Sequence, residues 1–209
     1  MSRQKKVVII DCGISNLGSL SQAILNLGHN ASIISDPKEI KKSDRLIFPG
    51  QGSFGEAMKR IINRGWFDEI RRSVLEDRTP ILGICLGMQL FAKKGSEFGG
   101  GEGLNLIDSE IIKISNTNLR IPHIGWNSVS NNPNSLLFTS IKPLTDFYFS
   151  HSYVMVTDDS SIVSSTCEYG LPFISSVEKG NIFGTQFHPE KSSKAGRLLL
   201  ENFCNLELC

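Results

Sequence analysis

A cysteine between two glycines, placed where an apolar run meets a helical stretch, is the feature that most constrains this chain. The segment Gly83-Ile84-Cys85-Leu86-Gly87 directly follows Pro80-Ile81-Leu82. A G-x-C-x-G segment at a strand-to-helix junction is typical of a nucleophile elbow, whose sharp turn has room only for glycine or small residues beside the nucleophile. The turn would set the Cys85 sulfur at the start of the next helix, where free backbone N–H groups favour a thiolate. The alternative is an ordinary buried cysteine, which would leave the glycines and Gln89 unexplained.

A second segment supplies a histidine and a carboxylate. Phe187-His188-Pro189-Glu190-Lys191 follows the strand-like run 182–186. Pro189 biases His188 toward an extended backbone, in which residues i and i+2 point the same way, so we expect His188 and Glu190 to share a face. A thiol nucleophile, a histidine base and a carboxylate that orients the base are the groups that acyl transfer needs. If His188 were an ordinary surface or core histidine, its neighbours Pro189 and Glu190 would be coincidental.

Together these segments resemble a known family. Gly-Ile-Cys-Leu-Gly-Met-Gln at 83–89 and Gln-Phe-His-Pro-Glu-Lys at 186–191 resemble the triad-type, class I glutamine amidotransferases, and the resemblance covers the whole chain. Two further segments, Pro-His-Ile-Gly-Trp-Asn at 122–127 and Tyr-Phe-Ser-His-Ser-Tyr at 148–153, are similar to the branch that serves imidazole glycerol phosphate synthase in histidine biosynthesis.

The resemblance implies a role for each matching position. Cys85 would attack the side-chain amide of glutamine, His188 would transfer protons and Glu190 would orient the histidine. The oxyanion of the tetrahedral intermediate needs preorganised donors, which the backbone would supply at Leu86, Gln51 and Gly52. The other matches are the substrate-binding positions Gly50, Gln89, Glu97, Ser152 and Tyr153 and the partner-interface positions Trp126, Tyr148 and Lys191. The chain departs from the family pattern at Gln51, usually valine, and at Cys12, usually tyrosine.

The expected chemistry also predicts a partner. Ammonia released from glutamine must reach an acceptor before bulk water converts it to ammonium. The sequence contains no phosphate loop, nucleotide fingerprint or metal-ligand spacing, so we expect delivery to another polypeptide. The resemblance implies a cyclase subunit with a (β/α)8 barrel, bound as a heterodimer, that makes imidazole glycerol phosphate and an aminoimidazole carboxamide ribotide. No cofactor and no metal are expected.

Composition argues against several other classes. A chain of 209 residues is long enough for one domain with a substantial core, predicted over 1–209. A net charge of +1 gives no reason to expect nucleic acid or an anionic membrane as a partner, and no apolar run has the length of a membrane span. The five cysteines are scattered without a C-x-x-C pair, which indicates reduced thiols and a cytoplasmic location.

The order of apolar segments predicts an α/β fold. The first half contains strand-like runs at 7–10, 31–34, 45–48 and 81–84. They alternate with helical stretches at 16–27, 53–63, 66–76 and 86–94. Such alternation favours a mostly parallel central sheet flanked by helices. The second half predicts an antiparallel extension and then a helix over 194–205, with strand-like segments at 109–114, 145–157, 161–166, 173–179 and 182–187.

The sequence leaves several functions open. The first is a histidine-pathway glutaminase, and the second is a paralogous glutaminase that feeds another synthase, such as one amidating a nucleotide sugar. The third is a triad-like binding protein without turnover, although the intact set of Cys85, His188 and Glu190 argues against it. A cysteine hydrolase acting on peptides is a fourth.

Overall fold

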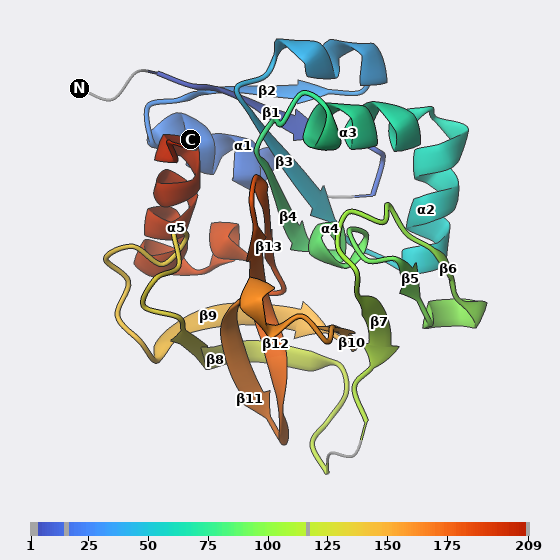
Figure 1. Ribbon diagram of the computed structural model, residues 1–209. Coiled ribbons are helices and arrows are strands. Elements are labelled where there is room, and N and C mark those ends of the chain that lie inside the picture. Colours follow the sequence, from blue (N-terminus) through green and yellow to red (C-terminus); the bar gives the residue numbers. More distant parts are fainter. Residues whose placement is uncertain (1–3, 15–16, 116–117, 208–209) are drawn as a thin grey trace.

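A large mixed sheet organises the chain, as the sequence predicts (Figure 1). The computed structural model describes residues 4–14, 17–115 and 118–207. The parallel strands are β1 (Lys6–Ile10), β2 (Asn30–Ile34), β3 (Arg45–Gly50), β4 (Ile81–Cys85) and β13 (Ile182–Thr185). The antiparallel extension consists of β12 (Leu171–Lys179), β11 (Val163–Tyr169), β8 (His123–Asn131) and β9 (Thr145–His151). The nine strands lie in the order β2-β1-β3-β4-β13-β12-β11-β8-β9.

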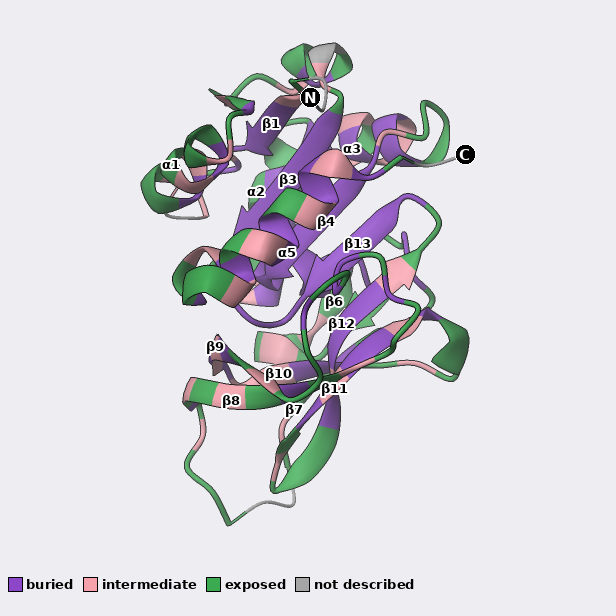
Figure 2. Cartoon of the chain, turned by 90° about the vertical axis from the view of Figure 1, so that its left-hand side faces the viewer, coloured by how far each residue is buried: buried purple, intermediate pink, exposed green. Residues whose placement is uncertain are grey.

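Helices cover both faces of the parallel strands (Figures 1 and 2). One face carries α1 (Gly18–Asn26) and α5 (Ser193–Asn205), and the other carries α2 (Phe54–Asn63) and α3 (Trp66–Leu75). A hydrophobic core lies on each side of the sheet, and alternate residues of β1 pack into one or the other. This follows because successive side chains of a strand point to opposite faces. Val7 and Ile9 pack with apolar residues of α1 and α5, and Val8 and Ile10 pack with those of α2 and α3.

A second, four-stranded sheet lies beside the first. It consists of β10 (Tyr153–Val156), β7 (Glu110–Lys113), β5 (Lys94–Gly95) and β6 (Gly101–Glu102). The strand predicted over 145–157 is therefore divided: β9 ends at His151 in the large sheet, and β10 begins at Tyr153 in the small one. Short 3₁₀ turns lie at Pro37–Lys42, Glu97–Gly99, Ser160–Ile162 and Pro189–Lys191. In the described ranges, no helix combines the length and the apolar character that crossing a membrane requires.

The helix predicted over 86–94 is much shorter in the structure. α4 spans Leu86–Gln89. The N–H of Leu90 still bonds four residues back, but those of Phe91 and Ala92 bond only three residues back. The carbonyls of Leu90 and Phe91 accept from the N–H groups of Leu104, Leu106 and Ile107, so the returning loop occupies acceptors that a longer helix would use. The strands β5, β6 and β8 were not predicted. The predicted helix start at Asn16 lies outside the described residues.

The turn between β4 and α4 is packed without spare room. A Cβ atom added to Gly87 would lie 1.7 Å from the carbonyl oxygen of Phe48 in β3, and one added to Gly83 would lie 2.6 Å from the Phe91 ring. Real Cβ atoms do not approach other atoms so closely. These two positions therefore need glycine for space, as the elbow interpretation predicts.

We expect Gly87→Ala to destabilise the fold by about 3 kcal/mol or more, because the obstructing atom belongs to the backbone of a central strand. Gly55 is the matched control: it lies in α2, and a Cβ there would meet nothing closer than 3.9 Å. Gly55→Ala should stabilise by about 1 kcal/mol through helix propensity. Urea unfolding followed by circular dichroism measures both changes. Equal free energies of unfolding for Gly87→Ala and the wild type would contradict the packing described.

Candidate active site

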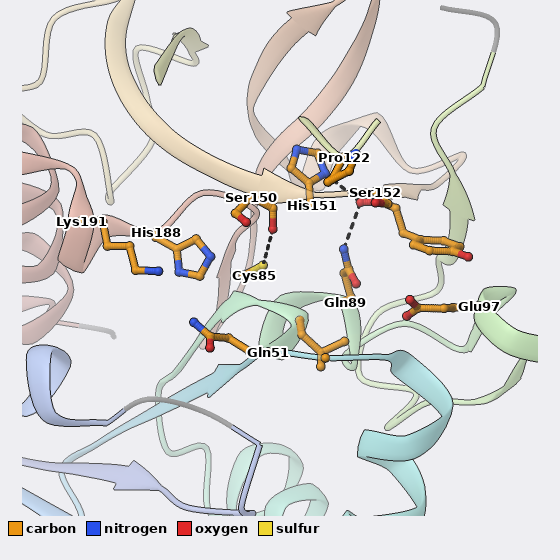
Figure 3. Close-up of a pocket in the computed structure, with 13 residues that line it drawn as sticks. Gln51, Cys85, Gln89, Glu97, Pro122, Ser150, His151, Ser152, His188 and Lys191 are labelled. Atoms are coloured by element: carbon orange, nitrogen blue, oxygen red, sulfur yellow. Dashed lines mark hydrogen bonds between the residues drawn. The ribbon is translucent and has the colours of Figure 1, made fainter. Parts of the chain in front are cut away.

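Cys85 occupies the tight turn between β4 and α4. Its backbone has φ 54° and ψ −112°, a conformation that costs a residue other than glycine about 1–3 kcal/mol and is found mostly at functional sites. The sulfur lies 3.8 Å from the carbonyl oxygen of Ser150 and 3.7 Å from Nε2 of Gln186. Cys85 is almost fully buried and lines a pocket of about 370 Å³ (Figure 3).

The pocket brings together most of the residues predicted from the sequence. Figure 3 shows His188 and Lys191 on one side of Cys85 and Gln89 and Glu97 on the other. The predicted residues that line it are Gln51, Gly52, Cys85, Leu86, Gln89, Glu97, Ser152, Tyr153, His188 and Lys191. Three lining residues were not predicted there: Pro122, Ser150 and His151. Among the described residues, no group of histidine, cysteine and carboxylate side chains could hold a metal ion.

His188 and Glu190 form the predicted pair, but by a different backbone geometry. His188 is extended, with φ −98° and ψ 96°, whereas Glu190 lies in the 3₁₀ turn Pro189–Lys191. The expectation of a continuous extended segment is therefore wrong at Glu190. The turn still brings Oε1 of Glu190 to 2.9 Å from Nδ1 of His188, which leaves Nε2 of the ring available on its other side.

The hydrogen bonds of His188 decide its charge. Burial disfavours the imidazolium, but hydrogen bonds with Cys85 and Glu190 outweigh it and raise the pKa of His188 to about 9. At neutral pH the ring is therefore protonated, with the Glu190 carboxylate on its Nδ1 side. An imidazolium in this position can give a proton to a leaving group.

Ser192 holds the His188 segment in place, a role that the sequence analysis missed. The Ser192 hydroxyl donates to the carbonyl of His188 at 2.6 Å and accepts from the N–H of Tyr148 at 3.0 Å. The N–H of His188 also donates to the carbonyl of Tyr148 at 2.9 Å. Because a lone serine carries no recognisable pattern, only its position just after the Pro189–Lys191 turn could have indicated this role.

The predicted oxyanion-hole donor at Gln51 is occupied in this structure. Its N–H donates to the carbonyl oxygen of Ile14 at 2.7 Å. Gly50 pairs with Cys85 in the β3–β4 register, so this segment lies directly beside the nucleophile. Gly52 has φ +104°, which side-chain-bearing residues rarely adopt. The Gln51 N–H is therefore near the pocket but committed to another acceptor.

The far end of the pocket carries two polar side chains. Nε2 of Gln89 donates to the carbonyl of Tyr153 at 3.0 Å and to Oε1 of Gln186 at 2.9 Å. Oε2 of Glu97 accepts from the N–H of Phe54, the first residue of α2, at 2.7 Å. An ammonium group would find acceptor oxygens of both side chains in this part of the pocket.

The three predicted interface residues lie together on the surface. Trp126 of β8 is opposite Tyr148 of β9 in the register, and their ring centroids are 6.1 Å apart. Nζ of Lys191 lies 5.8 Å from the centre of the Tyr148 ring. Trp126 is 52% exposed and Ile124, on the same face of β8, is 60% exposed. Since Lys191 also lines the pocket, this patch is continuous with it.

Two buried histidines support the pocket wall. Nδ1 of His151 lies 2.9 Å from the carbonyl of Tyr153, so this nitrogen carries the proton. Nε2 of His151 lies 3.1 Å from Nδ1 of His123 and accepts its hydrogen. Burial lowers the pKa of His123 to about 4 and that of His151 to about 3. Both rings are therefore neutral at pH 7, and the tautomer of each is fixed by its neighbour.

Comparison with known proteins identifies the class. The family model for class-I glutamine amidotransferases matches residues 8–206. The crystal structure of a glutamine amidotransferase from Thermotoga maritima aligns with a TM-score of 0.68 at 18% identity, covering 96% of this chain and 83% of the other. That likeness supports the fold alone. The chain belongs to the class I glutamine amidotransferase family, which confirms the resemblance inferred from its motifs.

Sequence relatives narrow the assignment to one branch. The imidazole glycerol phosphate synthase subunit HisH 1 of Campylobacter jejuni is 43% identical over 201 residues, covering 96% of this chain and 100% of the relative. The subunit HisH of Moorella thermoacetica is 42% identical over 202 residues, covering 97% and 95%. Within its family, the chain is thus a member of the HisH branch.

The histidine pair predicts a loss of stability in acid. Both pKa values are lower in the folded chain than the usual value near 6.5, so the unfolded chain binds more protons below that pH. We expect the free energy of unfolding to fall by at least about 2 kcal/mol between pH 7 and pH 5. His123→Phe keeps an aromatic ring against Phe149 and Tyr169 but cannot titrate, so its pH dependence should be shallower. Parallel curves for the two proteins in urea unfolding would contradict this account.

Proposed function

We propose that this chain is the glutaminase subunit of an imidazole glycerol phosphate synthase and acts in histidine biosynthesis. The observation that carries the proposal is identity above 40% to HisH subunits over nearly the whole chain, combined with a pocket that holds Cys85 beside the His188–Glu190 pair. The substrate is glutamine, and the products are glutamate and ammonia. A cytoplasmic location belongs to the same proposal and is supported by the free cysteines among the described residues.

In the first half of the reaction, the Cys85 thiolate attacks the side-chain amide carbon of glutamine. The S–C bond forms and the carbonyl oxygen becomes an oxyanion, which the N–H of Leu86 stabilises together with N–H groups at Gln51 and Gly52. The C–N bond then breaks, and the His188 imidazolium gives its proton to the departing ammonia. The raised pKa of His188 supports this step, since the proton is present at neutral pH.

In the second half, water hydrolyses the glutamyl thioester. Neutral His188 takes a proton from the attacking water, and the S–C bond breaks to release glutamate and restore the thiolate. Glu190 keeps the ring in place and stabilises its protonated form through the Nδ1 hydrogen bond. The substrate α-ammonium binds near Gln89 and Glu97, and the backbone at Gly50, Ser152 and Tyr153 contacts the rest of the amino-acid moiety.

The isolated subunit is proposed to rest in a weakly active state. The Gln51 N–H is bound to Ile14, so it must leave that acceptor before it can donate to the oxyanion. Binding of a cyclase partner with a (β/α)8 barrel, as a heterodimer, favours the released state, and ammonia passes to that partner. A partner can shift this equilibrium only by its differential affinity for the two states.

Glutaminase assays of the isolated chain and of its complex with the cyclase test this function. We expect slow hydrolysis alone and faster hydrolysis when the cyclase binds its nucleotide substrate. Cys85→Ala should abolish hydrolysis in the complex while synthase activity with added ammonia persists, because the acceptor site lies on the partner. Complementation of a histidine auxotroph separates this pathway from a paralogous one. Full glutaminase activity without any partner, unchanged when the cyclase is added, would refute the proposed coupling.

Trp126 is expected to anchor the partner. Exposed aromatic side chains that become buried in a complex often contribute most of the binding energy, so Trp126→Ala should weaken association by about 2 kcal/mol. Leu75→Ala is the control: Leu75 is 41% exposed at the end of α3, at the sheet edge where β4 starts and therefore opposite the pocket. Titration calorimetry with the cyclase measures both. Equal affinities for the two variants would exclude Trp126 as an anchor.

A further inference from the structure

Gln186 contacts the sulfur of Cys85. The family resemblance assigned it no role, and the proposed mechanism does not use it. It follows β13, is fully buried, and its N–H donates to the carbonyl of Ser175 in β12 at 2.9 Å. Its side-chain Nε2 donates to Sγ of Cys85 at 3.7 Å. A buried amide whose backbone is fixed by a neighbouring strand has little freedom to turn away.

The orientation of this amide follows from a chain of hydrogen bonds. The carbonyl of Tyr153 can only accept, so the group of Gln89 that lies 3.0 Å from it must be the NH₂. That NH₂ then has one hydrogen left, and it lies 2.9 Å from Gln186, which must present its oxygen. The nitrogen of Gln186 therefore faces Cys85. The carbonyl oxygen of Tyr153 thus sets the direction of the hydrogen bonds along the chain from Gln89 to Gln186 to Cys85. The same oxygen also accepts a hydrogen bond from Nδ1 of His151.

The same chain fixes what Gln89 offers to the pocket. Both hydrogens of its NH₂ are used, one on Tyr153 and one on Gln186, so its carbonyl oxygen is the group left for a ligand. If the Gln186 oxygen were missing, the Gln89 amide would keep only the Tyr153 carbonyl as an acceptor and would be held less firmly in this orientation.

We propose that Gln186 is a further residue of the catalytic site: its side-chain N–H stabilises the Cys85 thiolate, and its oxygen holds Gln89 with the amide oxygen toward the substrate. A donor hydrogen bond favours the charged form of an acceptor over the neutral one. The first role stands independently of the reaction, whereas the second rests on the proposed glutaminase function.

Other charged or titratable groups also face this region and are unchanged by a substitution at Gln186. They are His188 with Glu190 behind it, His151 of β9, and Lys191 and Glu97 in the pocket wall. A pH profile compared between variants therefore isolates the contribution of the amide.

The direct test is the rate of alkylation of Cys85 by iodoacetamide as a function of pH in the full chain. Peptide-level mass spectrometry reads Cys85 alone, and burial raises the pKa of Cys12, Cys167 and Cys204 to about 12, which keeps them slow. In Gln186→Met, the midpoint of the profile should move to higher pH by at least about one unit, which is a tenfold loss of rate on the rising limb. The KM for glutamine in the cyclase complex should also rise.

Thr185→Val is the matched control. Thr185 is buried, is the last residue of β13 and directly precedes Gln186. Its hydroxyl donates to the carbonyl of Phe187 and not to Cys85, so the alkylation profile of this variant should match the wild type. A profile for Gln186→Met that coincides with the wild type would overturn the proposal. A shifted profile in a protein without glutaminase activity would instead count against the proposed function and leave the role of Gln186 intact.

A measurement on the unaltered chain covers the case in which Gln186→Met does not fold. The side-chain amide resonances of Gln186 in ¹⁵N NMR should titrate with the same midpoint as the alkylation rate, and the titration should disappear in Cys85→Ala. Amide resonances that do not respond between pH 5 and 10 would overturn the proposal.

Discussion

The close contact of β3 with the turn after β4 is the constraint on which the site depends. Cys85 can keep a φ of 54° because Gly83 and Gly87 let the turn press against Phe48 and Phe91. The strands β3, β4 and β13 are adjacent and parallel, so their carboxyl ends meet at one edge of the sheet. β3 ends beside the proposed oxyanion donors, β4 ends at the proposed nucleophile Cys85, and β13 ends shortly before His188. Neighbouring strands thus bring together groups that lie far apart in the sequence.

The sequence predicted this arrangement wherever a local pattern carried the information. The alternation of apolar runs and helical stretches indicated the parallel sheet, and the G-x-C-x-G segment indicated the turn. The end of α4 was not predictable from local sequence. The carbonyls of Leu90 and Phe91 accept hydrogen bonds from Leu104, Leu106 and Ile107 and not from a continued helix, and this pairing depends on the tertiary fold. The strand over 145–157 was predicted as one element, since local propensity does not reveal that its two halves pair in different sheets.

Within the site, the sequence identified residue types better than contacts. The pairing of His188 with Glu190 was predicted on the assumption of an extended backbone, and the 3₁₀ turn achieves it by another path. Ser192 and Gln186 were missed as positioning groups, because their roles depend on β9 and α4, which only the fold brings near. One sequence feature did point to Gln186: it is the first residue of the segment 186–191, which also contains His188.

The residues that carry charge beside Cys85 differ from the residues that support the pocket wall. Charge is concentrated on His188 and Glu190, where hydrogen bonds keep the imidazolium protonated despite burial. Apart from Lys191 and Glu97, the surrounding wall is polar but neutral. His123, His151 and Gln186 are linked in it through the Tyr153 carbonyl and Gln89 by hydrogen bonds whose directions are fixed. Neutral groups avoid the desolvation cost of further buried ions, yet their hydrogen bonds hold the Cys85 side chain and the backbone at Tyr153.

The hydrogen bond from the Gln51 N–H to the Ile14 carbonyl sets a lower bound on the free energy that an activating partner must supply. A typical net hydrogen bond contributes about 1 kcal/mol, which corresponds to only about a fivefold change in an equilibrium. A larger activation therefore requires more than the loss of this bond. In the proposed function, reorientation of the backbone at Gly50 and Gly52 is one further contribution. Partner contacts at Trp126 and Tyr148 would be another, passed to the pocket through Lys191. Because Lys191 contacts Tyr148 and also lines the pocket, a partner that displaces it changes the surroundings of Cys85 without touching the nucleophile.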